Sequence, residues 1–368
     1  MRIAPPDAVD SSLLRRVLVI KLRHHGDVLL ASPVFTVLKS ALSAAEIDAL
    51  VYAETAPMLE GHPAISRLHT IDRDWKRRGA ITQARAEIGL LRALRSRHYD
   101  LVVHLTEHPR GAWLTRLLRP RYAVARELPR AHWLWRTSFT HYYRLPRATA
   151  RHTVECNLDA LRRLGLQPAS GERRLVLVTA PSDIARAAAL MTQHGLEKRG
   201  FIQLHPGSRW MFKCWTVEAY AELVDRLAAE GSTIAITGAP DRRERELVDA
   251  ILAARAAGAR SNVVDLVGQL SLRELAALTR EARLFVGVDS APMHIAAAVG
   301  TPVVALFGPS GEVEWGPWQV PHRVVASTEH PCRPCGNDGC GGGKVSECLT
   351  TLPVERVHAA VRALLAQT

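Results

Sequence analysis

The chain has 368 residues, of which 47% are hydrophobic, and a formal net charge of +12 at pH 7. This length exceeds what one hydrophobic core usually serves, so we expect two domains. No run of 18 apolar residues occurs, and the segment Met1 to Asp7 lacks the layout of a signal peptide. We therefore expect a cytoplasmic protein. The positive charge favours anionic partners, but no nucleic-acid-binding motif accompanies it.

The first half of the chain alternates short apolar runs with amphipathic segments, which favours a doubly wound, mostly parallel α/β sheet. The segment 167–172 has the composition of a linker. We expect one domain over residues 1–170 and a second over 171–368. The expected strands lie near residues 17–21, 47–52, 68–71, 101–104 and 122–125, and the expected helices near 28–41, 82–97 and 153–164.

The second half repeats this alternation, so ligands should bind at the carboxyl ends of both sets of strands. A last helix over 353–366 should pack back near the domain junction. The other expected elements are strands near 201–204, 233–237, 263–266, 283–288 and 303–307, and helices near 217–230, 241–255 and 272–279.

Residues 284–308 carry the strongest functional signal. The pattern predicts a buried strand, a turn, a helix and a second buried strand. Asp289 and Ser290 are good N-cap residues, and Pro292 suits the first helical turn. His294 should return to the N-terminal end of this helix one turn later. The segment predicts a phosphate or sugar-phosphate site at the helix N-terminus; the alternative is an ordinary βαβ unit in which Asp289 only caps the helix.

This segment resembles the donor-site signature of the family 9 glycosyltransferases, the bacterial lipopolysaccharide heptosyltransferases. Residues 17–33, 158–165 and 205–215 resemble the same family, so the similarity spans about residues 16 to 350. The local sequences around Asp27 and Lys213 are most similar to those of the heptosyltransferase III branch. The resemblance implies a GT-B fold, in which two Rossmann-like doubly wound domains face each other across a cleft. The N-terminal domain would bind the acceptor and the C-terminal domain the nucleotide-sugar donor.

The activity implied is that of an inverting, metal-independent glycosyltransferase without a cofactor. It would move L-glycero-D-manno-heptose from ADP-heptose to a heptose of the lipopolysaccharide inner core. The enzyme would work in the cytoplasm, with a peripheral contact at the inner membrane and no nucleic-acid partner. Three alternatives stay open: heptosyltransferase I or II, a GT-B-like sugar-nucleotide epimerase, and a zinc-dependent nucleic-acid-binding protein.

Asp27 and Lys213 are the candidate catalytic residues. Asp27 follows the first buried strand and the flexible Gly26, and the matching aspartate of the family is regarded as the general base. The alternative is that Asp27 is only the N-cap of the helix at 28–41. Lys213 would neutralise charge on the leaving diphosphate; the alternative is a surface lysine. His24 and His25 would contact the acceptor.

The remaining donor contacts are placed by the same resemblance. Asp289 would bind sugar hydroxyls, and no carboxylate pair suggests a site for Mg²⁺. Gly238 lies in the nucleotide-binding loop. Some relatives place a glutamate on the ribose; the aligned residue here is Arg242, so Asp241 or Glu244 would substitute. Residues expected at the phosphates are Ser208, Arg209, Ser290, Ala291 and His294.

Two further features concern partners. Residues 119–144 interleave arginines with Trp133 and Trp135, which suits a phosphoglycolipid or membrane-headgroup surface. We expect Arg130 and Arg136 to contact the acceptor; the alternative is buried aromatics with an exposed basic rim. Four cysteines lie in a Gly-rich loop, at spacings that differ from those of a zinc ribbon, so structural zinc stays open. They are Cys332, Cys335, Cys340 and Cys348.

Overall fold

The computed structural model describes residues 7–145, 150–259 and 262–367. The first six residues, on which the expectation of no signal peptide partly rests, lie outside them. The chain forms two compact units, Met1–Val178 and Thr179–Thr368. Residues beyond 170 still pack on unit 1. The Val176 N–H donates to Ser32 Oγ at 2.9 Å, and Leu175 and Leu177 are buried.

Unit 1 contains one six-stranded parallel sheet with the order β3-β2-β1-β4-β5-β6. Its strands are β1 (Arg16–Ile20), β2 (Glu46–Tyr52), β3 (Arg67–Ile71), β4 (Leu101–His104), β5 (Tyr122–Arg126) and β6 (His141–Tyr143). Its α-helices are α1 (His25–Leu29), α2 (Ser32–Ala41), α3 (Ala80–Arg95), α4 (Pro109–Leu118), α5 (Trp133–Ser138) and α6 (Thr153–Arg163). Short 3-10 helices are η1 (Ser11–Leu13), η2 (Ala53–Met58), η3 (Arg73–Lys76) and η4 (Ser170–Arg173).

Unit 2 repeats the plan with the order β12-β11-β10-β7-β8-β9, again parallel. Its strands are β7 (Phe201–His205), β8 (Thr233–Ile236), β9 (Val263–Asp265), β10 (Leu284–Val288), β11 (Val303–Phe307) and β12 (His322–Ala326). Its helices are α7 (Pro181–Gln193), α8 (Val217–Ala229), α9 (Arg242–Ala253), α10 (Leu272–Glu281), α11 (Ala291–Val299), α12 (Glu312–Trp315), α13 (Glu347–Thr350), α14 (Val354–Leu365), and the 3-10 turns η5 (Met211–Lys213) and η6 (Cys340–Gly342).

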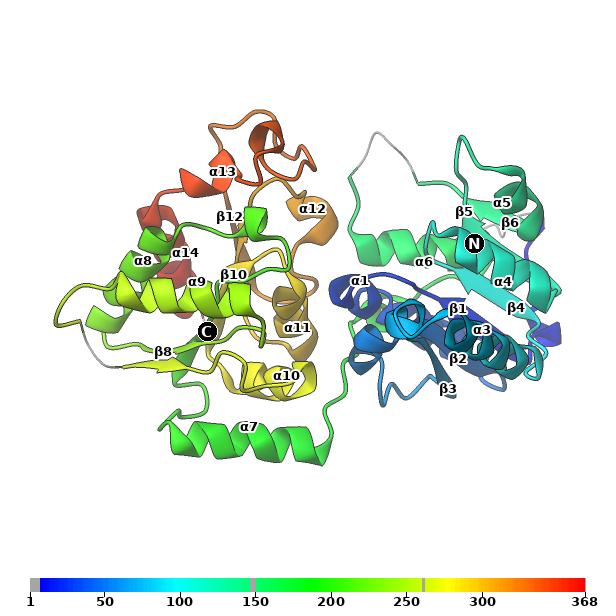
Figure 1. Cartoon of the computed structure of the whole chain (residues 1–368), viewed down its shortest axis with the longest axis horizontal. Helices are drawn as coiled ribbons and strands as arrows, with labels where there is room; N and C mark the ends of the chain where they lie inside the picture. Colours follow the sequence, from blue (N-terminus) through cyan, green and yellow to red (C-terminus); the bar gives the residue numbers. More distant parts are fainter. Residues whose placement is uncertain (1–6, 146–149, 260–261, 368) are drawn as a thin grey trace. The chain divides into compact units, whose positions relative to one another are not determined.

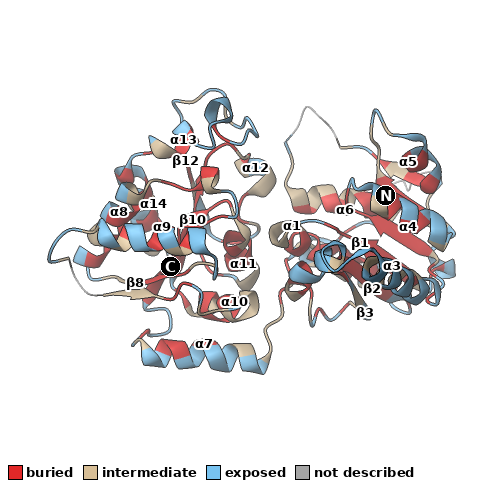
Figure 2. Cartoon of the chain, in the orientation of Figure 1, coloured by how far each residue is buried: buried red, intermediate tan, exposed pale blue. Residues whose placement is uncertain are grey.

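Both sheets have the strand order of a Rossmann-like fold, and helices flank the strands in each unit (Figure 1). Burial is concentrated in the strands and in the helix faces turned toward them (Figure 2). In each unit the order reverses between the first and fourth strands, which are β1 and β4 in unit 1 and β7 and β10 in unit 2. Sheets of this kind bind their ligands at the carboxyl ends of the two strands where the order reverses.

Some elements differ from those the sequence suggests. The helix expected at 28–41 is two helices, because the chain turns at Leu30 and Ala31 and Pro33 then opens α2. The short edge strands β6 and β12 were not anticipated. The last helix, α14, packs against α8 and β12 of unit 2. Among the described residues, no helix combines the length and apolarity needed to cross a membrane.

Candidate functional site

In unit 1, the loop after β1 is held by a buried lysine at the switch point. Lys21 Nζ donates to the Leu105 carbonyl at 3.2 Å and to Asn157 Oδ1 at 3.1 Å. Asn157 Nδ2 in turn donates to the Leu30 carbonyl at 3.1 Å. Burial lowers the pKa of Lys21, and the nearby Asp27 opposes that shift. The network ties β1, the end of β4 and α6 to the segment that carries Asp27. Lys21 lies in the family-like segment 17–33, and no role was predicted for it.

Asp27 lies in the first turn of α1 and is partly buried. The N-cap of this helix is His24, so the alternative that Asp27 is the N-cap of a helix at 28–41 is wrong. Within the described part of the chain, the Asp27 carboxylate accepts no hydrogen bond, which leaves both oxygens available to a ligand. His25 Nε2 lies 2.8 Å from the Glu54 carbonyl, so its ring links α1 to η2.

In unit 2, the loops after β7 and β10 bring together a lysine and an aspartate that are far apart in sequence. Lys213 Nζ donates to Asp289 Oδ2 at 2.6 Å. The Asp289 side chain is buried, whereas the Lys213 side chain is 21% exposed. His294 Nε2 lies 4.0 Å from Asp289 Oδ1, as the one-turn spacing predicted. The lysine therefore keeps its charge partly exposed to solvent, next to the carboxyl end of β10.

The N-terminus of α11 lies beside this pair. Ser290 is its N-cap, but its hydroxyl makes no cap hydrogen bond, and Pro292 occupies the first turn. The buried Ser290 Oγ has no hydrogen-bond partner among the residues described. The first N–H groups of a helix lack partners within the helix, so this end can receive an anionic group. Ala291, the first helical residue, is partly exposed there.

A second cluster surrounds the loop after β7. Glu244 is buried, accepts the Ala239 N–H at 2.7 Å, and lies 3.4 Å from His205 Nε2. Burial would raise the pKa of Glu244, but His205 and the Ala239 N–H outweigh it and lower that pKa. The carboxylate is thus ionised next to the Gly207 backbone, where a Cβ would lie 2.6 Å from Glu244 Cδ. A Cβ added to Gly238 would lie 3.3 Å from Glu244 Oε2, so Gly238 borders the same carboxylate.

The structure distinguishes between the two acidic residues considered for the ribose. Asp241 is the N-cap of α9, where it accepts the N–H groups of Arg243 and Glu244. Arg242 is exposed and pairs with Glu246. Only Glu244 is directed into the loop cluster, because it lies one turn further along the helix.

A cavity of about 540 Å³ adjoins Lys213. Its walls include Trp210, Phe212, Trp315 and Glu314. The Trp210 and Phe212 rings are stacked, with centroids 6.3 Å apart, and the Arg209 guanidinium lies 5.3 Å from the Trp210 ring centroid. Aromatic rings beside a carboxylate suit a sugar, which has apolar faces and hydroxyl edges. Ser208 is buried at the start of this loop.

The basic–aromatic stretch 119–144 does not form one surface. Trp135 is 5% exposed and donates from Nε1 to the Arg126 carbonyl, so the expectation that it lies at a lipid interface is wrong. Trp133 is 53% exposed. Arg130 and Arg136 are exposed, on the loop before α5 and in its last turn.

The cysteine loop offers no metal centre among the described residues. Cys332, Cys335 and Cys340 are exposed thiols, and Cys348 is buried. Burial raises the pKa of Cys348, assisted by the other three thiols and opposed by Arg333. No group of three or more His, Cys, Asp or Glu side chains in the described ranges is arranged to hold a metal ion. The structure therefore gives the zinc alternative no support.

The model of glycosyltransferase family 9 (heptosyltransferase) matches residues 88–345. The chain belongs to this family. This family 9 glycosyltransferase is 35% identical over 299 residues to lipopolysaccharide heptosyltransferase 3 of Escherichia coli, covering 81% of this chain and 84% of the relative. It is 26% identical to lipopolysaccharide heptosyltransferase 1 of Pseudomonas aeruginosa, over 95% of this chain and 98% of the relative.

Solved structures confirm the fold. The family 9 glycosyltransferase of Veillonella parvula superposes with a TM-score of 0.81 at 24% identity, covering 96% of this chain and 98% of that one. Escherichia coli ADP-heptose lipopolysaccharide heptosyltransferase II gives 0.74 at 22% identity, over 96% and 99%. The predicted fold of two Rossmann-like domains, the family and the glycosyltransferase class are confirmed.

Proposed function

We propose that this enzyme is an inverting, metal-independent transferase that moves L-glycero-D-manno-heptose from ADP-heptose to a heptose of the lipopolysaccharide inner core, as heptosyltransferase III does. The similarity to lipopolysaccharide heptosyltransferase 3 over most of both chains supports this acceptor class. The structurally similar Escherichia coli heptosyltransferase WaaC has been solved with ADP-2-deoxy-2-fluoro heptose, which supports the donor class. We place the reaction in the cytoplasm, with unit 1 binding the acceptor and unit 2 the donor.

The observation that carries the donor assignment is the Lys213–Asp289 pair beside the N-terminus of α11. In our proposal the donor's diphosphate binds at the amides of Ser290 and Ala291, with Ser208 and Arg209 on its other side. The Lys213 ammonium then leaves Asp289 and pairs with the β-phosphate. The freed carboxylate of Asp289, supported by His294, accepts hydrogen bonds from sugar hydroxyls.

The nucleoside end of the donor belongs, in this proposal, to the loops after β7 and β8. The Glu244 carboxylate accepts hydrogen bonds from the ribose hydroxyls, while Gly207 and Gly238 let the backbone approach the ligand. His205 keeps Glu244 ionised, which strengthens these hydrogen bonds. The heptose ring itself is directed toward the aromatic cavity next to Lys213.

The chemical step is a single displacement at the anomeric carbon. Asp27 removes the proton of the acceptor hydroxyl, and that oxygen attacks from the face opposite the diphosphate. The bond between the anomeric carbon and the β-phosphate oxygen breaks, so ADP leaves and the configuration inverts. Lys213 and the helix N-terminus stabilise the negative charge that develops on the leaving oxygen. His24 and His25 orient the acceptor at unit 1.

Two measurements test the proposal. Incubation with ADP-heptose and core acceptors truncated at successive heptoses, followed by mass spectrometry, should show one added heptose only where the side-branch heptose is missing. Addition to the heptose-free acceptor, or to the acceptor with one heptose, would instead assign heptosyltransferase I or II. Asp27→Asn should retain ADP binding but lose at least about 10²-fold in kcat. Near-normal turnover would remove Asp27 from the mechanism.

A further inference from the structure

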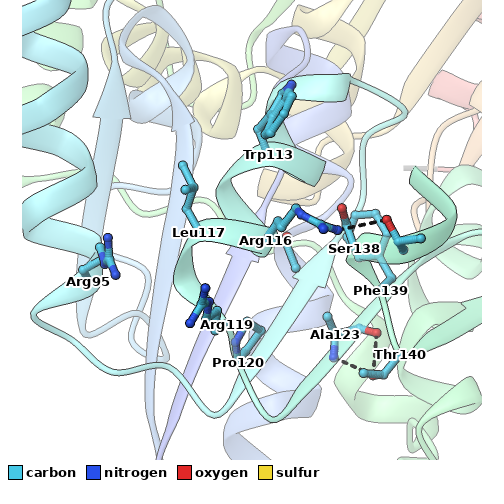
Figure 3. A pocket seen from close by; sticks show the side chains of 12 residues that line it. Arg95, Trp113, Arg116, Leu117, Arg119, Pro120, Ala123, Ser138, Phe139 and Thr140 are labelled. Carbon is cyan, nitrogen blue, oxygen red and sulfur yellow. Dashed lines mark hydrogen bonds between the residues drawn. The ribbon is translucent and has the colours of Figure 1, made fainter. Parts of the chain in front are cut away.

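A basic pocket lies on unit 1 at the edge of the sheet opposite to Asp27. It has a volume of about 570 Å³ and is lined by the ends of α3, α4 and α5, the start of β5 and the residues just before β6. Figure 3 shows Arg95, Arg116 and Arg119 around this hollow, with Trp113 and Leu117 on its rim. In a parallel sheet the amino and carboxyl ends of the strands lie at opposite edges, so the pocket is separate from the carboxyl ends of β1 and β4, where Asp27 lies.

The charge in this pocket is uncompensated. No carboxylate lines it, and Arg95, Arg116 and Arg119 form no ion pair with any described residue. Arg116 instead donates to Thr137 Oγ1 at 2.9 Å and lies 5.5 Å from the Trp133 ring centroid. Elsewhere in unit 1, Arg110, Arg126 and Arg144 pair with Glu87, Glu107 and Glu127. Three unneutralised guanidinium groups favour an anionic ligand.

Apolar side chains around the same pocket point to an amphiphile rather than a small ion. Trp113 is 50% exposed, Trp133 53% and Leu117 40%. Tryptophan combines an apolar ring with an N–H and is suited to the boundary between water and lipid. Arg119 ends α4 in the left-handed region at φ 50°, a position that glycine usually occupies.

We propose that the pocket formed by Arg95, Trp113, Arg116, Leu117 and Arg119 docks unit 1 onto an anionic phospholipid surface. The guanidinium groups contact lipid phosphates, while Trp113, Trp133 and Leu117 enter the headgroup layer. The lipid, not the acceptor sugar, is the ligand, so the docking is independent of the transfer reaction proposed above. An enzyme whose acceptor is lipid-anchored would gain from it, because membrane attachment raises the local acceptor concentration.

The test is binding of the full chain to vesicles with and without 30% phosphatidylglycerol. The charge variant is Arg95→Gln, Arg116→Gln and Arg119→Asn; Asn tolerates the left-handed backbone of position 119. A matched control replaces three other exposed arginines, Arg174, Arg186 and Arg323, by Gln, which removes the same charge. Each basic residue near an anionic surface strengthens binding about fivefold, so the charge variant should bind about 100-fold more weakly.

Four further outcomes complete the test. The control triple should bind within about threefold of the parent. Trp113→Ala with Trp133→Ala should weaken binding by an amount that 0.5 M salt does not change, whereas salt should remove the effect of the arginines. Equal binding by the charge and control variants would overturn the proposal, because net charge alone would then explain it. Competition by millimolar inorganic phosphate would also overturn it, because the pocket would then bind a small anion rather than a lipid surface.

Discussion

Replacing Gly207 by alanine tests the loop cluster that we assign to the nucleoside. A Cβ at this position would lie 2.6 Å from Glu244 Cδ, 2.6 Å from Glu244 Oε2 and 2.8 Å from Glu244 Cγ. Real side chains do not approach this closely, so the buried carboxylate has to move. Moving it breaks the hydrogen bond from the Ala239 N–H and the contact with His205.

The cost follows from these two interactions. A hydrogen bond to a charged group contributes about 1.5–3 kcal/mol, and overpacking a tight site costs about 1–3 kcal/mol. We expect Gly207→Ala to lower the free energy of unfolding of unit 2 by about 3 kcal/mol. The assay is urea denaturation followed by tryptophan fluorescence, together with titration of ADP.

A double-mutant cycle identifies the cause. Glu244→Ala removes the atoms that the new methyl group would meet, so Gly207→Ala should cost less than about 1 kcal/mol in that background. A control, Gly89→Ala, adds a methyl group with nothing within 4 Å in helix α3 and should not destabilise the chain. If Gly207→Ala is as stable as the parent, or costs as much without Glu244 as with it, the clash is not the cause.

Three other predictions concern the mechanism, the acceptor and pH. Activity should survive EDTA, while Lys213→Ala should lose both ADP affinity and rate; activity abolished by EDTA and restored by Mg²⁺ would contradict this. Arg130→Ala with Arg136→Ala should raise the KM for the acceptor and leave ADP-heptose affinity unchanged in steady-state assays. Burial lowers the pKa of His62 to about 4 and of His104 to about 3. Since their unfolded pKa is about 6.5, protonation favours the unfolded chain as the pH falls. The free energy of unfolding of unit 1 should therefore drop by about 2 kcal/mol per histidine from pH 7 to 5; a urea midpoint that is constant over this range would contradict it.

The alternation of strands and helices in this protein could be predicted from its sequence because the signals are local. Apolar runs such as 284–288 and 303–307 mark strands buried on both faces, and Gly300 after a helical pattern marks a helix end. His294 follows the N-cap residue Ser290 by about one helical turn, so the sequence predicted that Asp289 and His294 would both lie at the N-terminus of this helix. The family resemblance added the roles of Asp27 and Lys213, which no local pattern specifies.

Contacts between distant segments were decided only by the tertiary structure. No spacing rule pairs Lys213 with Asp289, or His205 with Glu244. The tryptophans at 133 and 135 are alike in sequence, yet one is exposed and the other buried. Whether each residue meets water or core depends on how the helices pack on the sheet, and that packing joins residues across tens of positions in the chain. A sequence pattern reports only on residues that are neighbours along the chain, so it does not specify this packing.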